Sequence, residues 1–294
     1  MEAEDTHVAP GLSRLQRLAR LRVLGKASPH GKGGFAMNET IDFPGPESPW
    51  FFTTEDHGEL SVLRFGCHLP ERAADLGQAQ KLWDFLEGSH AAARKVLLIT
   101  TQPGSLSPAS LDEFWEHVHG DHARMGFSPG ESLATVELAR EGNAFRRFVE
   151  VIRSIDAFSI MTMEGKCDLC FLGTALACDY RIVTDGTVFV NRFFDSEVTP
   201  GVLPWFLVRF IGQGRAAQIM HQTRPLDAHE AYGLSLVDDV TSSDDLEAVA
   251  MGVAREFAAK PAKALRAVKK SLAASFEDLR TYLDHIGTGF QHVR

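Results

Sequence analysis

The sequence lacks the features that mark membrane, secreted and nucleic-acid-binding proteins. Its apolar runs are all shorter than the ~20 residues that a membrane-spanning helix needs. The first residues, which include Glu2, Glu4 and Asp5, do not resemble a secretory signal. Lysine and arginine total 30 against 39 acidic residues, so the net charge of −9 disfavours binding to a phosphate backbone. We therefore expect a cytoplasmic protein with no integral membrane segment and no nucleic-acid partner.

Cysteine is also scarce, with four residues in a chain of 294. Only Cys167 and Cys170 form a close pair, and no second pair stands at zinc-ligand spacing. The pair also lacks the helix-starting context that lowers a thiol pKa in thioredoxin-like proteins. We expect four reduced, mostly buried thiols, and neither a metal ion nor a cofactor.

Hydrophobic residues make up 44% of the chain, which is enough for a large globular core. Residues 1–50 are predicted to be an N-terminal extension. Leucines at every third position from Leu12 to Leu24 indicate a short basic amphipathic helix, and a Gly/Pro/Ser-rich linker follows it. That helix could lie on an acidic partner surface or pack on its own protein. Residues 51–240 are predicted to form the core, and residues 241–294 a helical oligomerisation segment.

Strand and helix patterns alternate along the core, which predicts a parallel sheet built from βαβ units. The predicted strands are a hairpin over 51–65, a buried strand over 96–100, and strands over 158–163, 180–184 and 187–190. The predicted helices cover 74–88, a segment from about Leu111, 144–155, a segment after Gly201, and 244–275 with a break at Pro261. A further helix is predicted to be capped by Asp227, with Glu230 three residues later, and to stop at Gly233.

The chain is organised around the stretch from Met161 to Gly201. A buried strand ends at Glu164-Gly165, and a compact segment of small residues follows from Phe171. A strand that turns into a helix in this way aims backbone N–H groups beyond the strand end, where they can stabilise an oxyanion. The same pattern is also compatible with a simple tight corner.

Four blocks of residues resemble the crotonase superfamily, which contains enoyl-CoA hydratases and isomerases. They are Ala175-Leu-Ala-Cys-Asp-Tyr-Arg-Ile182, Thr199-Pro-Gly201, Thr223-Arg-Pro-Leu-Asp-Ala-His-Glu-Ala-Tyr-Gly-Leu-Ser-Leu-Val-Asp238 and Ala258-Ala-Lys-Pro-Ala-Lys-Ala-Leu265. The resemblance covers roughly residues 50–275 and implies an α/β fold, a crotonase-like spiral of ββα units with a C-terminal helical trimerisation segment. It also implies a thioester pocket in which two backbone N–H groups hold an oxyanion.

The oxyanion positions depart from the family pattern. The family's glycine triplet falls on Leu169, Cys170 and Phe171, so the resemblance gives Cys170 the second N–H donor. The first donor belongs to the loop after the strand at 96–100, which contains Ser107. Without gaps it falls on Pro108, which has no N–H. A shift of one residue would give the donor to Ala109.

The acid and base positions of the family are also changed. The two glutamates of the hydratases fall on Gly173 and Phe193, and the aspartate that some relatives carry falls on Gly201. Adding water to an enoyl thioester requires a group to activate water and a group to protonate the α-carbon. Glycine and phenylalanine can do neither, so we do not expect ordinary enoyl-CoA hydratase activity.

Substitute acid or base groups can be named at three places. Glu164 and Asp168 flank the strand end, and for each a surface turn is the plainer interpretation. Asp195 and Glu197 lie near the second missing glutamate. His119 belongs to the histidine-rich segment 116–122, which also reads as a solvated loop without a fixed scaffold for a metal.

Two hypotheses remain. The protein binds an acyl-CoA or acyl-carrier-protein thioester, or serves as a partner subunit, without ordinary catalysis. Alternatively, it is an active lyase, isomerase or hydrolase with relocated acid and base residues. A cleft filled by Phe171, Phe193 and Phe194 would favour the first hypothesis. In either case the apolar faces of the C-terminal helices predict a homotrimer or hexamer.

Overall fold

The structure is a computed structural model that describes residues 51–67, 69, 75–88, 94–114, 116, 133–194 and 200–274. All of these residues belong to one compact unit. The predicted N-terminal helix and linker, His119, Asp195 and Glu197 lie outside the described residues.

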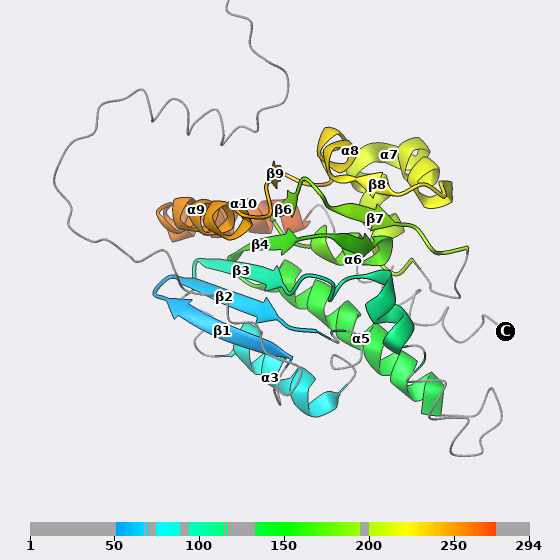
Figure 1. Ribbon diagram of the computed structural model, residues 1–294. Coiled ribbons are helices and arrows are strands. Elements are labelled where there is room, and N and C mark those ends of the chain that lie inside the picture. Colours follow the sequence, from blue (N-terminus) through cyan, green and yellow to red (C-terminus); the bar gives the residue numbers. More distant parts are fainter. Residues whose placement is uncertain are drawn as a thin grey trace, which may run out of the picture. The chain divides into compact units, whose positions relative to one another are not determined.

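The main sheet of this unit has six strands in the order β1-β2-β3-β4-β6-β9. β1 and β2 form the predicted hairpin, and β2, β3, β4, β6 and β9 run parallel (Figure 1). The bounds are β1 Phe52–His57, β2 Leu60–Phe65, β3 Val96–Thr101, β4 Phe158–Met163, β6 Tyr180–Thr184 and β9 Asp239–Thr241. Every residue of β2 and β3 is buried, as expected for strands of a parallel sheet that is covered on both faces.

A smaller sheet carries the part of the chain that follows β4. It has the order β5-β7-β8, with β5 at Lys166–Asp168, β7 at Val188–Val190 and β8 at Leu226–Asp227. The left-handed turn at Gly165, with φ of 76°, redirects the chain from β4 into β5. Helix α6 then begins at the residue after β5, so the predicted strand-to-helix corner is confirmed with a three-residue strand inserted into it.

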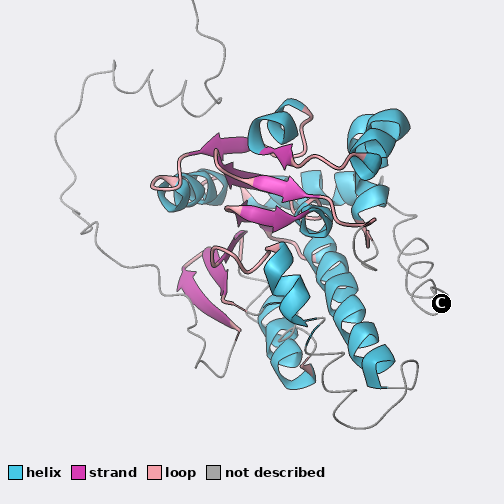
Figure 2. Ribbon diagram, turned by 45° about the vertical axis from the view of Figure 1, so that its right-hand side comes forward, coloured by secondary structure: helices cyan, strands magenta, loops and turns pink. Residues whose placement is uncertain are grey.

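Helices cover the main sheet (Figure 2). Their bounds are α3 Leu76–Glu87, α5 Leu133–Ser154, α6 Leu169–Ala175, α7 Leu203–His221, α8 Ala228–Gly233, α9 Leu246–Ala258 and α10 Ala262–Ala274. Because side chains alternate along a strand, Leu97 and Ile99 of β3 join the main core shared with α3 and α5. Val96 and Leu98 point to the opposite face, on which α9 packs.

Two helices begin earlier than predicted. α5 starts at Leu133 instead of 144. The helix after β3 starts at Pro108 instead of about Leu111, and Ser107 caps it by accepting a hydrogen bond from the Ser110 N–H at 3.2 Å. Proline suits the first helical position because its missing N–H would have no partner there.

The capping prediction for α8 is confirmed in part. Asp227 Oδ1 accepts the hydrogen bond of the Glu230 N–H at 2.8 Å. The Glu230 carboxylate does not reach back to Asp227 and instead forms a bidentate ion pair with Arg224.

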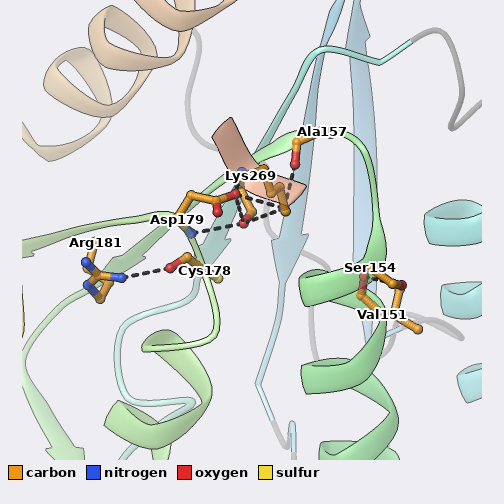
Figure 3. A network of polar contacts seen from close by, with 8 residues as sticks. Val151, Ser154, Ala157, Cys178, Asp179, Arg181 and Lys269 are labelled. Carbon is orange, nitrogen blue, oxygen red and sulfur yellow. Dashed lines mark hydrogen bonds and ion pairs between the residues drawn. The ribbon is translucent and has the colours of Figure 1, made fainter. Parts of the chain in front are cut away.

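A buried lysine ties α10 to the centre of the sheet (Figure 3). Lys269 Nζ lies 2.8 Å from Asp179 Oδ2 and donates a hydrogen bond to the Ala157 carbonyl at 2.7 Å. The same Asp179 oxygen accepts hydrogen bonds from the N–H and the hydroxyl of Ser159. Asp179 is the aspartate of the Ala175–Ile182 block, which therefore has a structural role at the start of β6.

Candidate functional site

The two segments predicted to hold the oxyanion lie next to each other. The N–H of Asp168, the last residue of β5, donates a hydrogen bond of 2.7 Å to the carbonyl of Leu106. This bond holds the loop after β3 against the start of α6. The loop itself is a series of turns, in which the Ser105 N–H binds the Gln102 carbonyl and the Ser107 N–H binds the Gly104 carbonyl.

The N–H predicted as the second oxyanion donor is already bound within the chain. Asp168 is the N-cap of α6, and its Oδ1 accepts a hydrogen bond of 3.1 Å from the Cys170 N–H. A carboxylate oxygen therefore lies at the point where the resemblance implies a thioester oxygen. Leu169 and Phe171, on either side of Cys170, are buried in the core.

The loop retains one N–H suited to the first donor position. Pro108 has none, and the Ser110 N–H is bound by the Ser107 hydroxyl. The Ala109 N–H makes no hydrogen bond with another residue that the structure describes. Ala109 thus lies in the first turn of its helix with its N–H available to a ligand.

Asp168 is buried, with 1% of its surface exposed, so the surface-turn interpretation is wrong for this residue. Its Oδ2 has no hydrogen-bond partner within the described part of the chain and lies 3.5 Å from Arg192 Nε. Burial raises the pKa of the Asp168 carboxyl, while the hydrogen bonds from Cys170 and the charge of Arg192 oppose that change.

Arg192 extends this polar cluster towards the surface. Its NH1 and NH2 groups bind the two carboxylate oxygens of Asp112 at 2.7 Å each. The side chain of Asp112 is 54% exposed, and the hydrogen bond from Arg192 lowers the pKa of its carboxyl. We call Asp168, Arg192 and Asp112 the carboxylate–arginine cluster. The sequence analysis did not select Arg192 or Asp112, because 80 residues separate them.

Gly173, which the resemblance assigns to the family's first glutamate, has no room for a side chain. A Cβ on Gly173 would lie 2.8 Å from the backbone N and Cα of Leu203 and 2.9 Å from its Cβ. α6 and α7 therefore pack backbone to backbone at this glycine.

Phe193 and Gly201, which the resemblance assigns to the other acid and base positions, carry no titratable group. Phe193 is half-buried against the core, and its N–H donates a hydrogen bond to Asn191 Oδ1. Gly201 has a φ of 53° in the left-handed region, which favours glycine. The neighbouring Phe194 is 69% exposed and stacks on His221, so it does not fill a cleft.

Of the remaining candidates, Glu164 is half-buried at the end of β4 and accepts a hydrogen bond from the Ser243 hydroxyl. This contact agrees with the surface-turn interpretation. Glu164 directly follows β4 and Asp168 is the last residue of β5, and only Asp168 belongs to the carboxylate–arginine cluster.

A small apolar cavity of about 40 Å³ lies beside the two oxyanion segments. Leu106 lines the cavity from the loop after β3, and Phe171 lines it from α6. Phe171 is therefore a wall of the cavity and does not fill it. Further walls come from β4 and α5, through Met161 and Phe148. Thr174 is the polar member of an otherwise apolar lining.

The cysteine prediction needs one correction. Cys170 lies in the first turn of α6, so the pair does flank a helix start. Burial nevertheless raises the pKa of the Cys167 thiol to about 12, which is the opposite of an activated thiol. Cys167 and Cys178 are buried, whereas Cys67 and Cys170 are only half-buried.

This fold and the retained sequence blocks define a crotonase-type protein. The chain belongs to the enoyl-CoA hydratase/isomerase family, whose sequence profile matches residues 137–287.

Two curated relatives illustrate the range of the match. The probable enoyl-CoA hydratase EchA17 of Mycobacterium tuberculosis is 28% identical over 162 residues, which are 51% of this chain and 60% of that protein. The ethylmalonyl-CoA decarboxylase of Rattus norvegicus is 34% identical over 145 residues, 46% of this chain and 45% of that protein. The matched part thus spans about half to three fifths of these relatives.

Solved structures confirm the predicted crotonase-like fold. An enoyl-CoA hydratase/isomerase from Cupriavidus metallidurans CH34 has a TM-score of 0.61 at 22% identity, covering 83% of this chain and 89% of that one. A putative enoyl-CoA hydratase from Thermobifida fusca YX in complex with CoA has a TM-score of 0.58 at 22% identity, covering 81% and 91%. Across the described residues, no helix is both long and apolar enough to cross a membrane.

Proposed function

We propose that this protein binds an acyl thioester, carried by CoA or by an acyl carrier protein, and does not hydrate enoyl thioesters. The hydrogen bond from the Cys170 N–H to Asp168 is the observation that carries this proposal. In the family's chemistry that N–H would stabilise negative charge on the thioester oxygen. Here it is bound to a carboxylate, which would repel such a charge.

The acid and base positions support the same proposal. General acid and base groups each contribute typically ~10²–10⁴-fold to a rate. A glutamate in place of Gly173 would meet the backbone of Leu203, and the Phe193 side chain cannot transfer a proton. Binding of the thioester does not need an acid or a base. The apolar cavity can still hold an acyl group, and the Ala109 N–H can still donate a hydrogen bond to the thioester.

Crotonyl-CoA hydration, followed by the loss of absorbance of the conjugated thioester, tests the catalytic part. We expect a rate at the background level, and a rate within tenfold of typical enzyme turnover, ~10–10³ s⁻¹, would refute it. Calorimetry with CoA and acetyl-CoA tests the binding part. Both should bind, with acetyl-CoA gaining little over CoA, because one of the two predicted donors is occupied.

A second function is favoured by Asp168 itself, whose buried Oδ2 has no hydrogen-bond partner among the described residues. In this alternative the protein is a lyase in which Asp168 transfers the proton. Loss of CO₂ from a β-carboxyl thioester breaks the bond to the carboxylate and leaves the electron pair as an enolate, which then takes a proton from protonated Asp168. This reaction needs no water-activating glutamate, and the similarity to a decarboxylase of acyl-CoA agrees with it. Conversion of malonyl-CoA to acetyl-CoA by the wild type, and a much lower rate of that conversion in Asp168→Asn, would support it. Equal rates in the two proteins would exclude it.

We also propose that the protein forms the homotrimer or hexamer implied by the resemblance. α9 buries its apolar face on its own sheet through Ala250, Val253 and Ala254. On α10, however, Val268 and Leu272 are 60% and 58% exposed. Light scattering should show a trimer or a multiple of it, and a monomer at micromolar concentration would contradict this proposal.

A further inference from the structure

The guanidinium of Arg192 lies between two carboxylates of very different exposure. On the inner side, its Nε lies 3.5 Å from Oδ2 of the buried Asp168. On the outer side, its NH1 and NH2 groups bind Asp112, whose side chain is 54% exposed. One edge of the guanidinium is thus fixed from within the protein, and the other faces a partner that solvent can reach.

We propose that Arg192 recognises a free carboxylate on the acyl group of the ligand, which would take the place of Asp112. The ligand class is then the thioester of a dicarboxylic acid, such as a malonyl thioester. This inference rests on the proposed function, namely that the site binds an acyl thioester.

The contact between Arg192 and Asp112 has the properties of a replaceable one. It is bidentate, so the guanidinium already presents the two parallel N–H groups that a carboxylate requires. An ion pair with an exposed carboxylate contributes little to stability, because water competes for both partners. A ligand carboxylate could therefore exchange with Asp112 at small cost.

Arg192 lies beside the predicted thioester position. The carboxylate of Asp168 lies between Arg192 and Cys170. Its Oδ2 is 3.5 Å from Arg192 Nε, and its Oδ1 accepts the hydrogen bond of the Cys170 N–H at 3.1 Å. The Nε side of the guanidinium thus lies about one carboxyl group from the predicted thioester position, and the NH1 and NH2 groups that bind Asp112 lie on its outer side. In a malonyl thioester, one carbon atom separates the carboxylate from the thioester carbonyl. The apolar cavity of about 40 Å³ is lined by Leu106 and Phe171 of the same two segments.

Calorimetry with CoA, acetyl-CoA and malonyl-CoA tests the inference, because acetyl and malonyl differ by the one carboxylate. The wild type should bind malonyl-CoA about 10- to 100-fold more tightly than acetyl-CoA, as expected for charge-assisted hydrogen bonds. Arg192→Gln should abolish that difference and leave acetyl-CoA binding within about threefold of wild type. Arg224→Gln is the matched control, since Arg224 also forms a bidentate ion pair, with Glu230, and should preserve the difference.

Asp112→Asn keeps the inference testable if Arg192→Gln does not fold. Removing the competing carboxylate should strengthen malonyl-CoA binding severalfold and leave acetyl-CoA binding unchanged. Equal affinities of the wild type for the two thioesters would overturn the inference while the proposed function stands. A preference for malonyl-CoA that survives Arg192→Gln would also overturn it. Failure of all three ligands to bind would overturn the proposed function itself.

Discussion

The contact between Gly173 and Leu203 yields the most direct test of the acid/base argument. Three Leu203 atoms, two of them backbone, lie 2.8–2.9 Å from the place of a Cβ on residue 173. The backbone of α7 cannot rotate away as a side chain could, so α6 and α7 must separate. Overpacking of this kind costs typically ~1–3 kcal/mol, against a gain of about 1 kcal/mol for replacing a helical glycine with alanine.

Gly252 in α9 provides the matched control. It is also a helical glycine, but it is exposed and nothing lies within 4 Å of the place of its Cβ. Gly252→Ala should therefore raise the free energy of unfolding by about 1 kcal/mol, and Gly173→Ala should leave it unchanged or lower it by up to ~2 kcal/mol. Gly173→Glu should have a still lower free energy of unfolding, and it should not hydrate crotonyl-CoA. Urea unfolding measures all three variants, and equal stability of Gly173→Ala and Gly252→Ala would refute the packing argument.

Two further predictions concern buried charges. Lys269→Met should lower the free energy of unfolding by ~3–5 kcal/mol, because it leaves Asp179 without its cation. Lys270→Met, at a 69% exposed position, should change it by under ~1 kcal/mol, and similar urea midpoints for the two variants would contradict the buried ion pair. Because the folded-state pKa of Asp168 is raised, its contribution to stability is full below the unfolded pKa of ~3.9 and is lost as pH rises through the folded value. Asp168→Asn, which can still cap α6, should therefore gain stability relative to wild type between pH 4 and pH 8, and a pH-independent difference in urea unfolding would contradict this.

The fold could be predicted from the sequence because its signals are local. The run 96–99 is apolar throughout, and Asp227 stands three residues before Glu230, so each element is marked within a few residues. The start of α5 was missed because residues 133–143 include Glu137, Arg140, Glu141 and Gly142, which gives that half of the helix little apolar periodicity.

The site was less predictable because its contacts are distant in the sequence. Asp168 was selected from its place at a strand end, but its burial depends on how β5 packs beside Leu106. Arg192 meets Asp112 across 80 residues, and Gly173 meets Leu203 across a helix–helix contact. No pattern in a single sequence marks such pairs. The loss of the family's acid and base residues stays a prediction, because it depends on which positions of this chain correspond to them.

The departures from the family pattern act together on one helix. Leu169 and Phe171 bury their side chains at positions that the resemblance assigns to the family's glycines, so the start of α6 is part of the core. Asp168 then caps the Cys170 N–H, and the missing side chain of Gly173 lets α7 approach closely. Each of these features packs α6 closely, and under the proposed function each takes the place of a feature that hydration would use. Restoring any one of them would leave the others in place, so a single substitution should not create a hydratase from this chain.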